Sequence, residues 1–146
     1  MTTPFVDNYR FLARYNCWIN QRLYEACEAL SDEGRKRDRG SFFGSIHRTL
    51  SHLVLADQVW LKRFAQCGTE NGITFPSLGA DVLDMPESYP QLTMRYSNSK
   101  GVQRAHPAWQ ALTHFFNHQT HHRGQATTLL TQAGGEVGLT DLIALV

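Results

Sequence analysis

Four of the seven histidines of this chain lie in one short apolar stretch, Trp109 to Gln125, which reads WQALTHFFNHQTHHRGQ. Apolar residues within and after it repeat at the three- and four-residue spacing of a buried helical face. A buried imidazole without a partner loses its hydrogen bonds to water without replacement. The stretch therefore predicts a helix with partnered inward histidines, and a metal ion is the partner that satisfies several imidazoles at once.

A helical projection separates these four histidines. His122 falls roughly 40° and His118 roughly 80° from the centre of the apolar stripe, at about 100° per residue. His114 and His121 fall further out, at roughly 120° and roughly 140°. His118 and His122 thus form an inward i, i+4 pair, the spacing at which two imidazoles on one helix share a metal ion. Solvated surface or hydrogen-bonded packing is the alternative interpretation.

Two long helices are expected before this one. Apolar residues recur at helical spacing from Phe5 to Leu30, between Pro4 and Ser31. Asn16 lies on or near the apolar face of that helix, either as a core polar contact or as a hydrogen-bond partner of a ligand residue. A loop over residues 31–44 leads to a second helix over about residues 45–66.

The second helix carries two more histidines and a carboxylate. His47 and His52 fall at opposite edges of its apolar stripe, roughly 100° and roughly 120° from the centre, so the projection does not say which of them reaches the His118/His122 pair. Asp57 interrupts the stripe itself. A carboxylate there either pairs with a core cation or orients a ligand histidine through its N–H.

The remaining segments are expected to be short. Pro76, Pro86 and Pro90, with several glycines, allow turns but no long helix between Gly68 and Gly101. Residues 91–96 alternate weakly in polarity and indicate a short strand or extended segment. The histidine helix is expected over about residues 107–133, where a Gly-Gly pair ends it. Residues 139–146 are expected to form a short closing helix.

Composition excludes several classes of protein. The chain has 146 residues, which suit one domain over 1–146 with a proper core. A formal net charge of +1 gives no reason to expect nucleic-acid binding. No apolar run is long enough to cross a membrane and no signal peptide is evident. Three cysteines without C-x-x-C spacing suit a reducing cytoplasm.

Three segments resemble the DinB/YfiT-like superfamily of metal-binding four-helix bundles: YNCWINQRLYEACEALSD, GSIHRTLSHLVLADQVWLKRF and HFFNHQTHHRGQ. The resemblance covers about half of the chain. It implies an all-α, up-down helical bundle with one divalent metal ion held by one histidine of the second helix and the outer two of an H-x-x-x-H motif. In this sequence those residues are His52, His118 and His122, so the resemblance resolves the choice between His47 and His52.

The chain departs from that family in one respect. The interval between the second helix and the histidine helix is too short and too rich in proline and glycine for a third long helix with its loops. We therefore expect this helix to be short or missing. The apolar groove left behind would be covered by a second subunit, which predicts a homodimer through this region or through the first helix.

Three functions are compatible with these residues. Three protein ligands leave one position of a zinc-like site open, as in catalytic sites. The ion, with zinc or nickel favoured, would activate either a low-molecular-weight thiol for transfer or water for hydrolysis. The superfamily is similar to thiol-using transferases and isomerases, so thiol transfer to a small-molecule substrate is preferred. A metal-binding protein without turnover is the non-enzymatic alternative, and DNA binding has only the family name in its favour.

Overall fold

The computed structural model describes residues 4–75 and 84–146. These residues form four α-helices, two 3-10 helices and one two-stranded sheet, in the order α1 (Pro4–Glu28), α2 (Asp32–Lys36), α3 (Ile46–Glu70), η1 (Tyr89–Gln91), β1 (Thr93–Ser97), β2 (Gln103–Pro107), α4 (Ala108–Gln132) and η2 (Leu142–Leu145). The fold is mostly helical, as expected, but an all-α description omits the strands. No helix of the described segments combines the length and apolarity that crossing a membrane requires.

The chain divides into two compact units, and each of the three long helices contributes to both. We call residues Met1–Ala13 and Ala56–Asn117 the hairpin unit, and residues Arg14–Leu55 and His118–Val146 the histidine unit. The expectation of one domain over residues 1–146 stays a prediction, as does the bundle arrangement.

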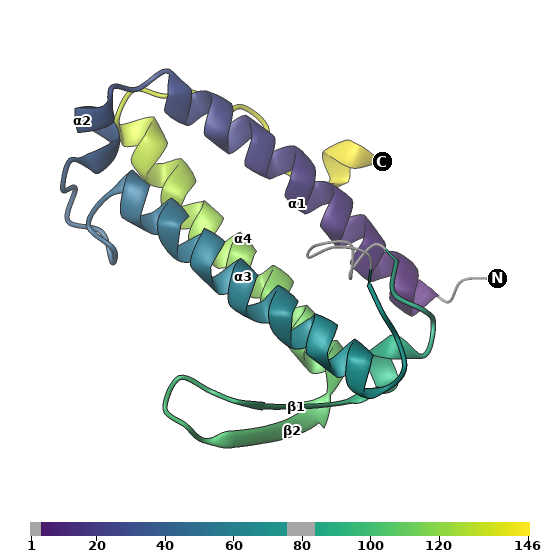
Figure 1. Ribbon diagram of the computed structural model, residues 1–146. Helices are drawn as coiled ribbons and strands as arrows, with labels where there is room; N and C mark the ends of the chain where they lie inside the picture. Colours follow the sequence, from purple (N-terminus) through teal and green to yellow (C-terminus); the bar gives the residue numbers. More distant parts are fainter. Residues whose placement is uncertain (1–3, 76–83) are drawn as a thin grey trace. The chain divides into compact units, whose positions relative to one another are not determined.

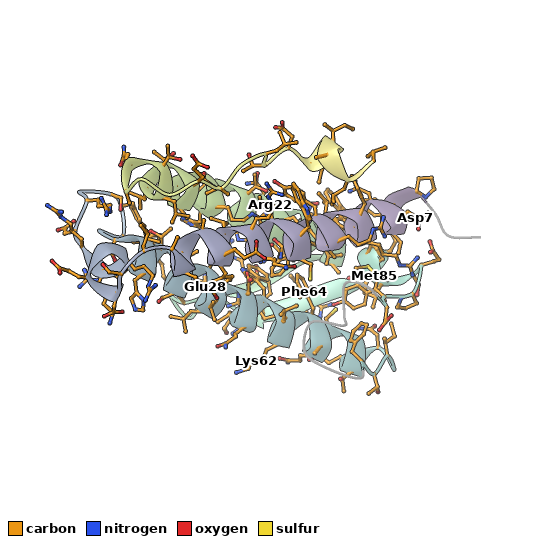
Figure 2. All side chains as sticks on the ribbon, turned by 90° about the horizontal axis from the view of Figure 1, so that it is seen from above. Asp7, Arg22, Glu28, Lys62, Phe64 and Met85 are labelled. Atoms are coloured by element: carbon orange, nitrogen blue, oxygen red, sulfur yellow. The ribbon has the colours of Figure 1, made fainter. Side chains whose placement is uncertain are left out.

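The core of the hairpin unit forms where α1 begins, α3 ends and α4 begins. Its fully buried members include Phe64, Tyr89 and Met94, and the Tyr89 hydroxyl donates a hydrogen bond of 2.7 Å to the carbonyl oxygen of Phe64. Figure 2 shows Phe64 among the packed side chains, whereas Lys62 on the same helix extends outward. The two side chains thus lie on opposite sides of α3, as expected for an amphipathic helix.

The two strands of the hairpin unit pair antiparallel, with Thr93 opposite Pro107 and Ser97 opposite Gln103. The Oδ1 atom of Asn98 accepts hydrogen bonds from the N–H groups of Lys100 and Val102, which closes the turn. The weak alternation over residues 91–96 thus corresponds to a strand. Its partner β2 was not expected, and it leads directly into α4 (Figure 1).

No long α-helix lies among the described residues between α3 and α4, namely 71–75 and 84–107. They hold η1 and the hairpin instead. Pro76 and Gly79, which contributed to the expectation for this interval, lie outside the described residues.

In the histidine unit, the C-terminal half of α1, the first part of α3 and the last part of α4 lie side by side (Figure 1). Leu23, Ile46 and Leu130 are each at most 1% exposed in their shared core. Figure 2 shows Arg22 reaching from α1 toward the segment after α4, where its guanidinium donates a hydrogen bond to the carbonyl oxygen of Val137. Two of these segments, the first part of α3 and the last part of α4, also carry histidines.

Helix ends agree with the local sequence. After α4, the N–H of Gly135 bonds to the carbonyl oxygen of Leu130 and that of Gly134 to Thr131, while Gly134 has φ +84°. This is the glycine-dependent helix stop that the Gly-Gly pair predicted. Ser31 was expected only to mark the end of the first helix. Its Oγ also accepts a hydrogen bond from the N–H of Gly34 and so caps α2.

Two expectations for the shorter segments need correction. The supposed loop over residues 31–44 contains α2, which has five residues and is too short to show a periodic pattern. The closing helix is the single 3-10 turn η2 rather than a helix over residues 139–146.

Candidate metal centre

The three histidines selected as metal ligands lie together in the histidine unit. His52 belongs to α3, and His118 and His122 lie one turn apart on α4. One ring nitrogen of each lies within 4.8 Å of those of the other two. The Nε2 atoms of His52 and His118 are 3.0 Å apart, and the ring centroids of His52 and His122 are 4.5 Å apart. The three histidines are therefore positioned to bind one metal ion.

These distances fit a tetrahedral ion. With metal–nitrogen bonds of about 2.0–2.1 Å, two nitrogen ligands of zinc lie about 3.3 Å apart. The His52–His118 separation of 3.0 Å is close to that value, and all three ligand atoms lie within 4.8 Å of one another. The site is also partly shielded, because His122 is 8% exposed and the other two rings are half-buried.

Gln125 holds the ring of His122 in place. Its Oε1 atom lies 2.7 Å from Nδ1 of His122, so the imidazole donates its Nδ1–H to the amide oxygen. This hydrogen bond leaves the lone pair on Nε2 free for a metal ion. Ligand histidines usually donate their second N–H to such an acceptor, which fixes both tautomer and orientation.

Partial burial favours the neutral imidazole that a metal ion requires. Burial lowers the pKa of His52 below the ordinary histidine value, and the electrostatic effect of nearby His122 lowers it further. A neutral His52 keeps a nitrogen lone pair available near pH 7.

Phe43 covers one side of the cluster and was not anticipated from the sequence. Its ring lies against His52, with centroids 4.3 Å apart and planes inclined by 26°, and its centroid lies 5.3 Å from that of His122. A tight turn places it there, in which the N–H of Gly44 bonds to the carbonyl oxygen of Ser41 at 2.9 Å. The signal was present as two adjacent phenylalanines between glycines in an otherwise polar loop.

The other histidines of the two histidine-bearing helices lie outside the cluster. His47 is the second residue of α3 and is exposed, and His121 is exposed although its ring centroid is 4.7 Å from that of His122. His114 belongs to the hairpin unit, where its ring lies 5.1 Å from that of Trp60. His114 and His121 thus lie outside the cluster, as the helical projection indicated, and so does His47, as the family resemblance implied.

Asp57 and Asn16 were the two other polar residues that the sequence placed near the ligands. Asp57 is half-buried on α3 but belongs to the hairpin unit, so its suggested role beside a ligand stays a prediction.

Asn16 accepts a hydrogen bond from Arg123, the residue after His122. Arg123 is only 4% exposed, and its guanidinium also lies 5.4 Å from the ring of Tyr15. A buried arginine held by an amide and an aromatic ring was not expected from the sequence.

Comparison with known proteins agrees with this geometry. The DinB family model matches residues 5–105 and 75–145, which together cover nearly the whole chain. The chain belongs to the DinB family. It is also 26% identical to Protein DinB of Bacillus subtilis (strain 168) over 153 aligned residues, which cover 89% of this chain and 88% of that protein. No solved structure matches the chain significantly. The DinB family is metal-binding, in accord with the three clustered histidines.

Proposed function

We propose that His52, His118 and His122 bind one divalent transition-metal ion and that this DinB protein uses it to activate a small thiol. The observation that carries the proposal is the convergence of three ring nitrogens within 4.8 Å, with no carboxylate in the cluster that the described residues form. A divalent ion bound there would lower the pKa of a coordinated thiol or water molecule. Zinc and nickel are the ions we favour, since imidazole ligands suit both.

The neutral ligand set favours sulfur over water. Three imidazoles add no negative charge, so the site keeps the full positive charge of its ion and prefers an anionic ligand such as a thiolate. Four-coordination with three protein ligands leaves one position for it. Gln125 fixes the ring of His122, and Phe43 shields His52 from water on one side. Gln125 and Phe43 therefore orient and shield the histidines independently of any bound ligand.

The sulfur must come from a second molecule. Cys17 is exposed, Cys27 and Cys67 are buried, and none belongs to the histidine cluster. In the proposed reaction, the cosubstrate thiol loses its proton to solvent, and its sulfur forms a bond with an electrophilic carbon of the second substrate. The bond from that carbon to its leaving group breaks at the same time, and the leaving group departs with the electron pair and takes up a proton from solvent. All three cysteines are free, which favours a reducing compartment, and we propose the cytoplasm.

Cobalt substitution tests the proposal. The Co²⁺-loaded protein, prepared without an affinity tag, should give a sulfur-to-metal charge-transfer band in the near ultraviolet when titrated with glutathione or cysteine. The band should be absent in His122→Ala and unchanged in a variant without cysteines. Turnover of esters or amides without any thiol-dependent band would favour a metal-dependent hydrolase. If neither occurs, the protein binds metal without catalysis.

A further inference from the structure

A cavity of about 540 Å³ lies in the histidine unit between the loop before α3 and the outer face of α4. Arg39, Ser41 and Phe42 line it on the loop side, and His121, Gln125 and Thr128 on the helix side. Its volume lies in the range of about 300–1,000 Å³ that small-molecule sites occupy. The cavity is therefore large enough for a small organic ligand.

The cavity lies beside the three-histidine cluster, although none of the three histidines lines it. Gln125 lines it and also accepts the hydrogen bond from Nδ1 of His122. His121 and Phe42, which line it, are the chain neighbours of His122 and Phe43. A molecule in this cavity thus contacts Gln125, which orients His122.

The charge of the cavity selects an anion. Among the described residues that line it, Arg39 carries the only fixed charge and none is acidic. One Nη2 hydrogen bond, to the carbonyl oxygen of Gly34 at 3.2 Å, anchors its guanidinium to α2. A single cation compensates a singly charged carboxylate better than a phosphate dianion, and the planar guanidinium matches carboxylate geometry.

Two polar groups of the cavity wall lack partners. Nε of Arg39 and Oγ of Ser41 are buried without a hydrogen bond in the described part of the chain. An unsatisfied buried donor is unfavourable, and native structures usually supply a partner for it. Because both atoms are buried, rotations of the Arg39 and Ser41 side chains would turn the Nε–H and the hydroxyl toward the oxygens of a ligand carboxylate in the cavity.

We propose that this cavity binds the carboxylate of a small organic acid whose other end reaches the three-histidine cluster. The inference rests on the proposed function and deepens it: the thiol used by this protein carries a carboxylate, which Arg39 and Ser41 recognise. Thr128 and Gln125 offer a hydroxyl and an amide for polar groups between the two ends.

Two thiols that differ only in charge test this inference. The Co²⁺-loaded full-length protein is titrated with 3-mercaptopropionate and with its neutral amide, and the charge-transfer band reports each Kd. We expect the carboxylate to bind about tenfold more tightly, as a charge-assisted hydrogen bond gives. Arg39→Gln should remove the preference without weakening amide binding, and Arg37→Gln, an exposed arginine of the same loop that does not line the cavity, should keep it.

Two more variants separate recognition from loop structure. Arg39→Lys retains the positive charge and should retain part of the preference. Ser41→Ala leaves Arg39 intact and should weaken 3-mercaptopropionate severalfold while leaving the amide unchanged. Equal Kd values for the two thiols in the unmodified protein would overturn the inference while leaving thiol activation intact. So would a preference that survives in both Arg39→Gln and Ser41→Ala.

A metal-independent measurement keeps the two proposals distinguishable. If no thiol produces a band, thiol activation fails, and the protein as purified is titrated instead with butyrate and butyramide. Amide resonances of Gly40, Ser41 and Gly124 in ¹H–¹⁵N spectra should then shift with butyrate and not with butyramide or inorganic phosphate. Absence of butyrate-specific shifts, or equal shifts in Arg39→Gln, overturns the carboxylate site.

Discussion

Nε2 of His52 lies 3.0 Å from Nε2 of His118, although 66 positions separate the two residues in the sequence. Two imidazole nitrogens at this distance are held either by one shared proton or by one ion. The ring of His122 completes the set, with its centroid 4.4 Å from that of His118. Three converging nitrogen donors favour the ion.

The first prediction concerns metal content. His52→Ala, His118→Ala and His122→Ala should each lose stoichiometric metal, with zinc affinity falling by more than the roughly 10–100-fold typical of losing an outer partner of a ligand. Elemental analysis and competition with a chromophoric chelator measure this. His121→Ala is the sharpest control, because this exposed ring neighbours His122 and lies outside the cluster. Full metal retention in His118→Ala would contradict the assignment.

The second prediction concerns Gln125. Removing the acceptor of the His122 Nδ1–H in Gln125→Leu should weaken zinc binding by roughly 10–100-fold, because the imidazole loses its fixed tautomer and orientation. Gln125→Glu keeps an acceptor, and a stronger one, so its zinc affinity should equal or exceed that of the unmodified protein. Competition with a chelator measures the zinc affinity of the unmodified protein and of the two variants. Equal affinity in Gln125→Leu would mean that the bond does not support metal binding.

The third prediction concerns pH. Burial, aided by nearby His122, lowers the pKa of His52 in the folded protein relative to about 6.5 in the unfolded chain. As pH falls below about 6.5, protons therefore bind the unfolded state first, and the metal-free protein loses stability until the pH passes the lower folded pKa of His52.

Thermal denaturation of metal-free protein between pH 7 and pH 5 measures this effect. Tm should fall less over this interval in His52→Gln than in the unmodified protein, since glutamine does not titrate. Zinc affinity should also weaken below about pH 6, because ligand imidazoles must be neutral. Identical Tm profiles for the two proteins would show that His52 does not contribute.

The fourth prediction compares two adjacent phenylalanines. Phe43 stacks on His52, whereas Phe42 is 82% exposed. Phe43→Ala removes the aromatic cover of the cluster and should speed zinc release to a chelator severalfold, since water then reaches the ligands from that side. Phe42→Ala should leave the release rate unchanged. Equal rates in the two variants would remove Phe43 from the description of the site.

Sequence periodicity was sufficient to predict the long helices and to place His118 and His122 on the inward side of α4. The first helix was predicted over Phe5–Leu30 and spans Pro4–Glu28. The second was predicted over residues 45–66 and spans Ile46–Glu70, and the histidine helix was predicted over residues 107–133 and spans Ala108–Gln132. Such long amphipathic helices repeat their apolar face many times, so the pattern is strong. Periodicity did not distinguish His47 from His52, because both fall at the edges of one apolar stripe. The family resemblance supplied that choice.

What the sequence did not predict depends on short elements and on contacts across the chain. Five residues of α2 are too few for a periodic signal, and β2 lacks the alternation that marks a half-buried strand. The position of Phe43 results from a turn whose geometry follows from local hydrogen bonds rather than from composition. The partnership of Arg123 with Asn16 joins α4 to α1, and single-sequence patterns hold no information about such pairs.

The last prediction is a homodimer, which earlier followed from an uncovered apolar surface on the first helix or in the interval before α4. The histidine unit exposes such a surface, where Tyr24, Val54 and Leu55 are 45%, 43% and 63% exposed beside a cavity of about 660 Å³. Adjacent exposed apolar side chains of this kind mark interaction sites. Sedimentation equilibrium at micromolar concentration should therefore show a dimer.

Leu55→Lys should weaken the dimer by roughly tenfold or more, because it places a charge in an apolar contact. Ile143→Lys, a matched change at a residue 72% exposed on η2, should leave the dimer intact. A monomeric unmodified protein, or equal weakening in both variants, would exclude this surface as the interface.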